Sequence, residues 1–269
     1  MFYVKIVYLS KTQLQRVLAT IMLILLSVVM VQVNESIAVS AFLNVKKELP
    51  IYSVATEEKK LAISFDAAWG AEYTSKIMDI LEERNIKTTF FLVGFWIDKY
   101  PERAQEIAQR GHEVANHSTT HPEMSKLSKE QIVSEVMTTQ KKIEDLAGEH
   151  SVRLLRPPFG DYDDLLIQTC REMGFHVIQW DVDSLDWKEL GVEHMFDRVT
   201  KKAGNGSIVL FHNNAKHIVE ALPIILDHLL EEGYTIVPVS ELIYWEDYRL
   251  DHTGRQYPIE NENQGHKMN

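Results

Sequence analysis

The fold is decided at residues 61–70, which have the sequence Leu61-Ala62-Ile63-Ser64-Phe65-Asp66-Ala67-Ala68-Trp69-Gly70. The first half is a short apolar run typical of a buried strand, and residues 71–84 have the apolar spacing of a helix. An open, doubly wound sheet that binds dinucleotides has Gly-x-Gly-x-x-Gly after its first strand. Here the strand runs into an acid and one late glycine, so the sequence disfavours that kind of sheet.

Strand-like and helix-like segments alternate along the rest of the chain. Short apolar runs predict strands at residues 61–65, 88–93, 113–115, 152–155, 176–180, 207–211 and 235–239. Helical spacing predicts helices at residues 71–84, 101–109, 128–146, 162–173, 192–202, 217–232 and 240–248. Strands that alternate with helices form a parallel sheet, and this many units favour a closed or nearly closed β/α barrel. An open sheet is the structural alternative.

The composition limits the classes of function. The chain has 45% hydrophobic and 25% charged residues, as expected for a globular protein with a sizeable core. A net charge of −11, without runs of Lys and Arg, excludes a basic nucleic-acid surface. The single cysteine, Cys170, rules out an intramolecular disulfide and is expected in the core of a helix.

The N-terminus has the pattern of a targeting segment. Lys5, Lys11 and Arg16 precede an uncharged apolar run over residues 17–33. This predicts an N-terminal hydrophobic helix that is a signal peptide or a single membrane anchor. Small residues at 36–41 suit cleavage by a signal peptidase. We therefore expect an exported protein, either anchored in the membrane or secreted to the cell envelope.

The chain divides into four predicted parts. Residues 1–36 are the signal peptide or membrane anchor, and residues 37–60 are a linker. Residues 61–245 form the folded domain, because the alternating pattern begins and ends there. Residues 246–269 are a polar tail that we expect to be loose from Asp251 onward.

Side chains that can carry chemistry follow five of the predicted strands. They are Asp66, His117 with His121, Arg156, Asp183 and His212. In a β/α barrel the carboxyl ends of the strands meet on one rim, where active sites are built. Acids, histidines and an arginine on one rim are typical of a metal-dependent hydrolase.

The chemistry of these side chains suggests roles. A divalent metal held by His117 and His121 would polarise a carbonyl group and bind a water molecule. Asp66 is the candidate general base for that water, and His212 is the candidate general acid for the leaving group.

Two further residues are predicted to support the base and the acid. Arg156 would orient Asp66 through a charge-assisted hydrogen bond, and Asp183 would hold His212 in its protonated form. Purely structural alternatives exist: Asp66 could cap the helix that follows it, and Arg156 could pair with Asp161.

The motifs resemble those of a known family. They are Phe65-Asp66 with Gly70, His117-Ser118-x-x-His121, Arg156-x-Pro158-Phe159-Gly160, Asp183-x-x-x-Trp187 and Leu210-x-His212. In this order they are similar to the five motifs of the polysaccharide deacetylases, the NodB-homology or carbohydrate esterase 4 family. The stretch over residues 64–70 resembles the sporulation-associated, PdaB-like branch of that family.

The resemblance implies a fold, a cofactor and a reaction. The fold would be a distorted (β/α)7–8 barrel of the NodB type. The cofactor would be a divalent metal, zinc first and cobalt, manganese or nickel as alternatives. The reaction would remove N-acetyl groups from amino sugars of peptidoglycan or a chitin-like polymer. The partner would then be a cell-wall glycan rather than a nucleic acid, with membrane contact through an uncleaved N-terminal segment.

The resemblance also assigns residues. It gives Asp66, His117, His121, Arg156 and His212 the roles of base, metal ligands, support for the base and acid. On the substrate side it implies that Phe159, Trp187 and Leu210 line the sugar groove. A backbone N–H near Phe159 would help to hold the oxyanion.

One position departs from the family pattern. The family usually has Asp-Asp in its first motif, with the second Asp on the metal, whereas this chain has Ala67. Two protein ligands remain, although catalytic zinc normally keeps three. Three alternatives follow from this departure: another group completes the metal site, Asp66 binds the metal as well as acting as the base, or the site is weak or inactive. The alternatives to a deacetylase are therefore a degenerate protein that binds glycan or serves in assembly, and an amidase for small amides such as ureides.

Overall fold

The computed structural model describes residues 47–259 and positions 11, 12, 15, 18, 20–23 and 25–27, whose backbone is helical. The chain divides into two units, Met1–Lys47 and Glu48–Asn269. Most of the predicted signal peptide or anchor, and part of the predicted linker, lie outside the described residues. No helix made of described residues has the length and apolar composition that crossing a bilayer requires.

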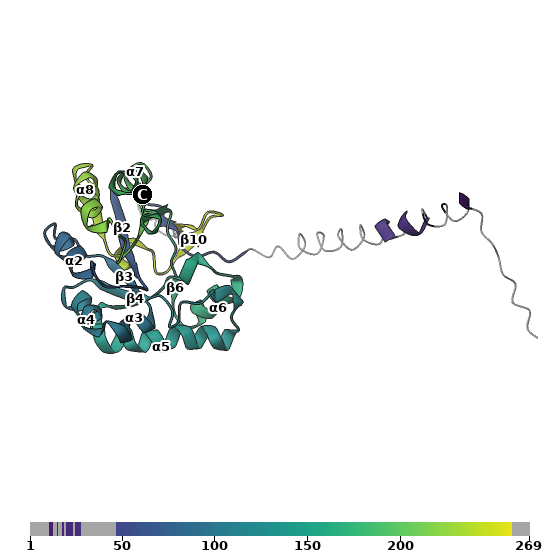
Figure 1. Cartoon of the computed structure of the whole chain (residues 1–269), viewed down its shortest axis with the longest axis horizontal. Coiled ribbons are helices and arrows are strands. Elements are labelled where there is room, and N and C mark those ends of the chain that lie inside the picture. Colours follow the sequence, from purple (N-terminus) through teal and green to yellow (C-terminus); the bar gives the residue numbers. More distant parts are fainter. Residues whose placement is uncertain are drawn as a thin grey trace, which may run out of the picture. The chain divides into compact units, whose positions relative to one another are not determined.

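The second unit is built on a curled parallel sheet (Figure 1). Its strands pair in the order β6-β5-β4-β3-β2-β8-β7, and β9 pairs separately with β2. The strands are β2 (Lys60–Ala67), β3 (Thr89–Leu92), β4 (Glu113–Asn116), β5 (Ser151–Leu155), β6 (His176–Val177), β7 (Val182–Asp183), β8 (Ile208–His212) and β9 (Thr235–Val237). The pairing ends at β6 and β7, so the predicted β/α barrel is confirmed in a distorted, partly open form.

Helices follow most of these strands and lie on the outside of the sheet (Figure 1). They are α2 (Thr74–Glu82), α3 (Gly94–Lys99), α4 (Pro101–Gln109), α5 (Lys129–Ala147), α6 (Asp164–Glu172), α7 (Val192–Thr200), α8 (Ile218–Glu231) and α9 (Val239–Leu242). Four short 3₁₀ turns complete the connections: η1 (Met124–Lys126), η2 (Gly148–His150), η3 (Pro158–Gly160) and η4 (Asp186–Lys188). As predicted, Cys170 is buried in α6.

The alternation of side chains along β2 determines where Asp66 points. Ile63 and Phe65 belong to the core cluster that the strands share with the helices. The ring centres of Phe65 and Phe90 are 5.0 Å apart, and the two rings are stacked. Ala62 belongs instead to the cluster inside the curled sheet. Because successive strand residues face opposite sides, Asp66 shares the inner face with Ala62. The carboxylate is therefore directed into the mouth of the barrel.

A second, three-stranded sheet joins the two ends of the folded unit. It has the order β1-β11-β10, from β1 (Ser53–Val54), β10 (Tyr248–Leu250) and β11 (Arg255–Pro258). The loose tail that we expected from Asp251 is therefore corrected for residues 251–258. The fully buried side chain of Gln256 explains the order, since it accepts from the backbone N–H of Tyr244 at 2.9 Å and donates to the Tyr244 carbonyl at 2.6 Å.

Candidate active site

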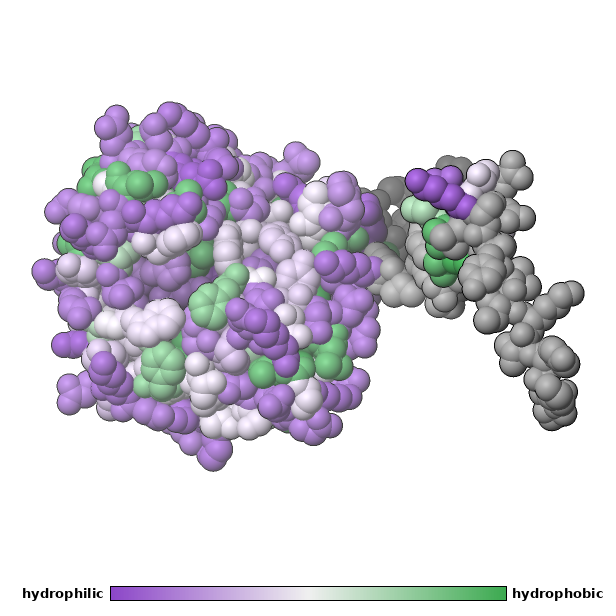
Figure 2. Space-filling view, turned by 45° about the vertical axis from the view of Figure 1, so that its right-hand side comes forward, coloured by the Kyte–Doolittle hydropathy of each residue, from purple (hydrophilic) through white to green (hydrophobic). Residues whose placement is uncertain are grey.

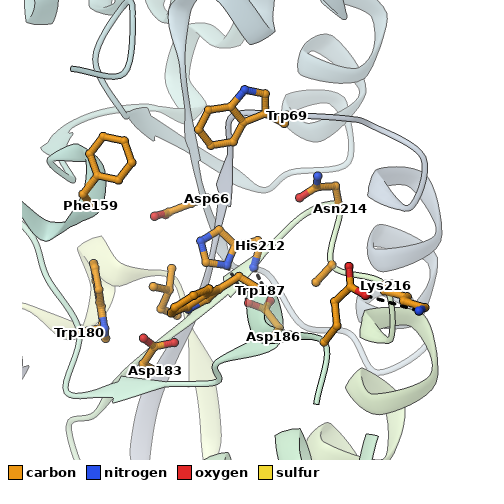
Figure 3. Close-up of a pocket in the computed structure, with 13 residues that line it drawn as sticks. Asp66, Trp69, Phe159, Trp180, Asp183, Asp186, Trp187, His212, Asn214 and Lys216 are labelled. Carbon is orange, nitrogen blue, oxygen red and sulfur yellow. Dashed lines mark hydrogen bonds and ion pairs between the residues drawn. The ribbon is translucent and has the colours of Figure 1, made fainter. Parts of the chain in front are cut away.

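A cleft of about 560 Å³ lies at the carboxyl ends of the strands (Figure 3). Six of the nine predicted site residues line it, namely Asp66, Phe159, Asp183, Trp187, Leu210 and His212. The surface of the folded unit is mostly hydrophilic, with paler and apolar patches (Figure 2). The three other predicted residues, His117, His121 and Arg156, connect to the cleft through contacts with Asp66 and Phe159.

Asp66 is bound by a buried arginine. Its Oδ1 accepts a hydrogen bond from Nη1 of Arg156 at 2.8 Å, as predicted, and both side chains are almost fully buried. The guanidinium also donates to the carbonyl of Gln179 at 3.2 Å and lies 4.0 Å from the centre of the Phe91 ring. Burial alone would raise the pKa of Asp66, but the charge of Arg156, with that of the nearby His212, lowers it below its usual value. Asp66 is therefore an ionised carboxylate.

His117 follows β4 and is held in one tautomer. Its Nδ1 lies 2.6 Å from the carbonyl oxygen of Arg156, which can only accept, so Nδ1 carries the proton. Its Nε2 then presents a lone pair, 3.6 Å from Oδ2 of Asp66. Burial lowers the pKa of His117 and outweighs the attraction of Asp66. The ring is a neutral donor of an electron pair.

His121 brings a second imidazole to the same place. Its ring centre is 5.0 Å from that of His117. Its Nδ1 is buried and makes no hydrogen bond to any described residue. Burial is the largest cause that lowers the pKa of His121, to about 4, so this ring is also neutral.

The two neutral imidazoles fit a divalent metal of borderline softness as two donors. A third donor is missing: the described residues contain no group of three His, Cys, Asp or Glu side chains arranged to hold a metal. Ala67, which occupies the expected ligand position, is fully buried. The carboxylate beside His117 is that of Asp66.

His212 lies directly beside Asp66. The two residues are register partners across the parallel strands β2 and β8. Burial opposes protonation of His212, but a hydrogen bond to Asp186 and the charges of Asp186, Asp66 and Asp183 raise its pKa above the usual value. The site therefore pairs an ionised carboxylate with an imidazole that retains its proton.

Asp186, which the sequence analysis missed, makes the contact that was predicted for Asp183. Oδ1 of Asp186 lies 2.7 Å from Nδ1 of His212, and its Oδ2 accepts from the His212 backbone N–H at 2.7 Å. Asp183 instead accepts from the backbone N–H of Leu185 at 2.8 Å and reaches His212 only through its charge. Leu185 has a φ of 55°, and this left-handed turn brings Asp186 under the histidine.

Backbone strain gathers around the cleft. Of the seven non-glycine residues with positive φ in the described part, five lie in the loops that carry the site: Ser118, His121, Phe159, Leu185 and Glu189. Such conformations cost about 1–3 kcal/mol each and persist where the surrounding structure enforces them. Their concentration in these loops is typical of a functional site.

Two tryptophans also lie at the cleft. Trp69, to which the sequence analysis assigned no role, is exposed and lines the cleft. Trp180 is half-buried and lines the cleft as well. The position of Trp69 within the first motif, between Asp66 and Gly70, was the available signal.

Comparison with known proteins agrees with this geometry. Residues 53–178 match the family model described as polysaccharide deacetylase. The chain is 34% identical over 200 residues to a peptidoglycan-N-acetylglucosamine deacetylase of Bacillus cereus, covering 72% of this chain and 93% of the relative. The chain belongs to the polysaccharide deacetylase family. The predicted family, and with it a carbohydrate N-deacetylase, is thus confirmed at the level of the family.

Two other members are informative. The chain is 27% identical over 209 residues to peptidoglycan-N-acetylmuramic acid deacetylase PdaA of Bacillus subtilis, covering 77% of this chain and 80% of the relative. Its fold is similar to that of a carbohydrate esterase 4 pseudoenzyme from Bacillus anthracis, with a TM-score of 0.69 and 34% identity over 72% of this chain and 68% of that one. The family therefore includes both named deacetylases and a pseudoenzyme similar to this chain.

Proposed function

We propose that this protein is a metal-dependent hydrolase that removes N-acetyl groups from amino sugars of a cell-wall polysaccharide. One observation supports the proposal most strongly. Asp66 and His212 are neighbours across β2 and β8, and their surroundings shift their proton affinities in opposite directions. An ionised base beside a protonated acid, at the mouth of a cleft, suits hydrolysis of an amide.

Two side chains would transfer protons, and two others would hold them in place. Asp66 accepts the proton of the attacking water, and Arg156 keeps it ionised and oriented. His212 then gives its proton to the nitrogen that leaves as an amine. Asp186 holds Nδ1 of His212, so that Nε2 is the atom that donates. A backbone N–H near Phe159 is proposed to stabilise the oxyanion.

His117 and His121 would hold the metal, for which we propose zinc, with cobalt, manganese or nickel as alternatives. A bound divalent ion supplies Lewis acidity to the carbonyl group and lowers the pKa of a water molecule. With Ala67 in place of an acidic ligand, we expect weaker binding than at a site with three protein ligands.

The substrate is proposed to be peptidoglycan or a chitin-like polymer. The names of the relatives support peptidoglycan, because one is named as a deacetylase of its N-acetylglucosamine and the other as a deacetylase of its N-acetylmuramic acid. Phe159, Trp187 and Leu210 line the cleft and would contact the sugar. The basic residues and apolar run of the N-terminus support export to the cell envelope, anchored or secreted. A role in sporulation and a place in the PdaB-like branch rest on residues 64–70.

A second candidate function is a degenerate glycan-binding or assembly protein. Ala67 favours it, because it removes an expected metal ligand. The similarity to a carbohydrate esterase 4 pseudoenzyme favours it as well. This protein would bind glycan in the same cleft without hydrolysing it.

Acetate release tests the proposal. The full chain, supplied with zinc, is expected to release acetate from peptidoglycan or from N-acetylglucosamine oligomers. Asp66→Asn should reduce the rate by about 10²–10⁴-fold, the range for loss of a general base. Asp145→Asn, in an exposed ion pair of α5, is the matched control and should leave the rate unchanged. Absence of acetate with all four metals and both substrates would contradict the proposal, and glycan binding without release would favour the second candidate.

A further inference from the structure

Trp69 is exposed at the cleft, and the proposed proton transfers make no use of it. Its side chain is 57% exposed, although tryptophan is on average a highly buried residue. Four Trp and Phe side chains are exposed in the described part of the chain, and three of them line this cleft: Trp69, Phe159 and Trp187. Single exposed aromatic residues need no explanation, but three around one cleft indicate a ligand.

The turn that carries Trp69 is fixed on both sides. The carbonyl oxygen of Gly70 accepts from Nε1 of Trp96 at 2.6 Å and from Nδ2 of Asn213 at 3.1 Å. Gly70 has a φ of 63°, and a Cβ atom there would meet the Glu72 carboxylate and Asn214. The turn is thus specified by glycine and by two side chains from other elements. An aromatic ring held in place before binding loses less entropy when a ligand arrives.

The indole extends the wall of the cleft beyond the reacting groups. Its ring lies edge-on to His121 at 4.7 Å, and His121 lies edge-on to Phe159 at 4.5 Å. Rings from three loops therefore follow one another along the rim. In Figure 3, Trp69 and Trp187 lie on either side of Asp66 and His212.

We propose that Trp69 is a platform for a sugar ring next to the one that reacts, so that the cleft selects a glycan chain over a single sugar or a small amide. The inference rests on the proposed function and adds a residue that would bind the glycan chain beside the reacting ring. One face of a pyranose carries mainly C–H groups, and stacking on an indole removes apolar surface of both partners from water. Trp69 provides such a surface on the side away from Trp187, where a neighbouring ring of the chain would lie.

Binding to an inactive protein tests the platform. The full chain with Asp66→Asn is titrated calorimetrically with N-acetylglucosamine and with its hexamer. Adding Trp69→Ala should weaken hexamer binding at least fivefold and binding of the single sugar much less, whereas Trp69→Phe should keep most of the hexamer affinity. Trp245→Ala is the control, since Trp245 is 41% exposed and is absent from the lining of the cleft. Equal hexamer affinity with and without the Trp69 indole would overturn the platform.

Because Trp69 touches His121, the titrations are repeated with a chelator and with zinc. The same loss of hexamer affinity under both conditions supports a direct contact between Trp69 and sugar. A loss of affinity only with zinc overturns that contact. Failure of the proposed reaction is recognised separately. If the wild type releases no acetate but Trp69→Ala still weakens hexamer binding, deacetylation fails and the platform stands. If acetate is released at equal rates from N-acetylglucosamine and from its hexamer, deacetylation stands and the platform fails.

Discussion

The two sides of the cleft treat the same kind of side chain in opposite ways. On the side of β4, burial makes His117 and His121 poor proton acceptors, and their pKa values fall. On the side of β8, contact with Asp186 raises the pKa of His212 despite burial. The difference teaches that a histidine keeps its proton where a carboxylate contacts its Nδ1. Where no carboxylate does so, burial lowers the pKa and the ring is neutral.

The two sides also divide the work. The β4 side offers neutral nitrogen donors, which a metal requires, and the β8 side offers a proton donor, which a leaving amine requires. Asp66 lies between them and is kept ionised by Arg156. The predictions below change the pair of Asp66 and Arg156 between the two sides, then the β8 side, then the metal side.

The largest effect is expected from removing the guanidinium of Arg156, which pairs with Asp66. Arg156→Met leaves a buried, unpaired carboxylate at Asp66, which should lower the free energy of unfolding by about 3–5 kcal/mol at neutral pH. The loss should shrink as pH falls, because Asp66 can then be neutralised by protonation. Urea denaturation at two pH values measures both. Lys201→Met removes an exposed ion pair with Asp197 and should cost at most about 1 kcal/mol. Equal losses for the two variants would show that the Asp66 pair is not special.

The next effect concerns the acid. Asp186→Asn removes a charge-assisted hydrogen bond, of about 1.5–3 kcal/mol, from the protonated form of His212. The alkaline limit of acetate release should move to lower pH, with a rate loss of about 10–100-fold above it. Asp183→Asn acts only on the longer-range charge and should move the limit less. A larger shift for Asp183→Asn would contradict the assignment of Asp186.

Much of this site could be predicted from the sequence. Asp66, His117, Arg156 and His212 were found because each follows or ends a strand of one parallel sheet, and parallel strands deliver their ends to one rim. The contact between Asp66 and Arg156 followed from their charges. The carboxylate that contacts His212 could not be identified in this way, because Asp183 and Asp186 lie in the same short run of sequence. A left-handed turn at Leu185 selects between them, and leucine carries no signal for that conformation.

The last two strands show the same limit for the fold. Tyr248–Leu250 and Arg255–Pro258 are short and partly polar, so their pattern resembles a loop. Their order depends on pairing with Ser53–Val54, which lies about two hundred residues earlier in the chain. Contacts between such distant segments leave no local pattern to read.

The smallest effect is expected from restoring the missing acid. Ala67→Asp should increase zinc affinity about tenfold by adding an anionic ligand. Without metal the variant should be less stable than the wild type, because the new carboxylate is buried, and zinc should raise its melting temperature more than that of the wild type. Ala67→Asn is the matched variant without the charge. If both variants respond to zinc as the wild type does, residue 67 does not face the metal.

The most direct test of the division between the two sides reads the histidines themselves. Nitrogen-15 NMR of the histidine rings, assigned with His117→Gln, His121→Gln and His212→Gln, follows their protonation in the metal-free protein without requiring activity. We predict that His212 remains an imidazolium above the usual histidine pKa, while His121 stays neutral until about pH 4. A neutral His212 at pH 6, or a charged His121 at pH 7, would contradict the account.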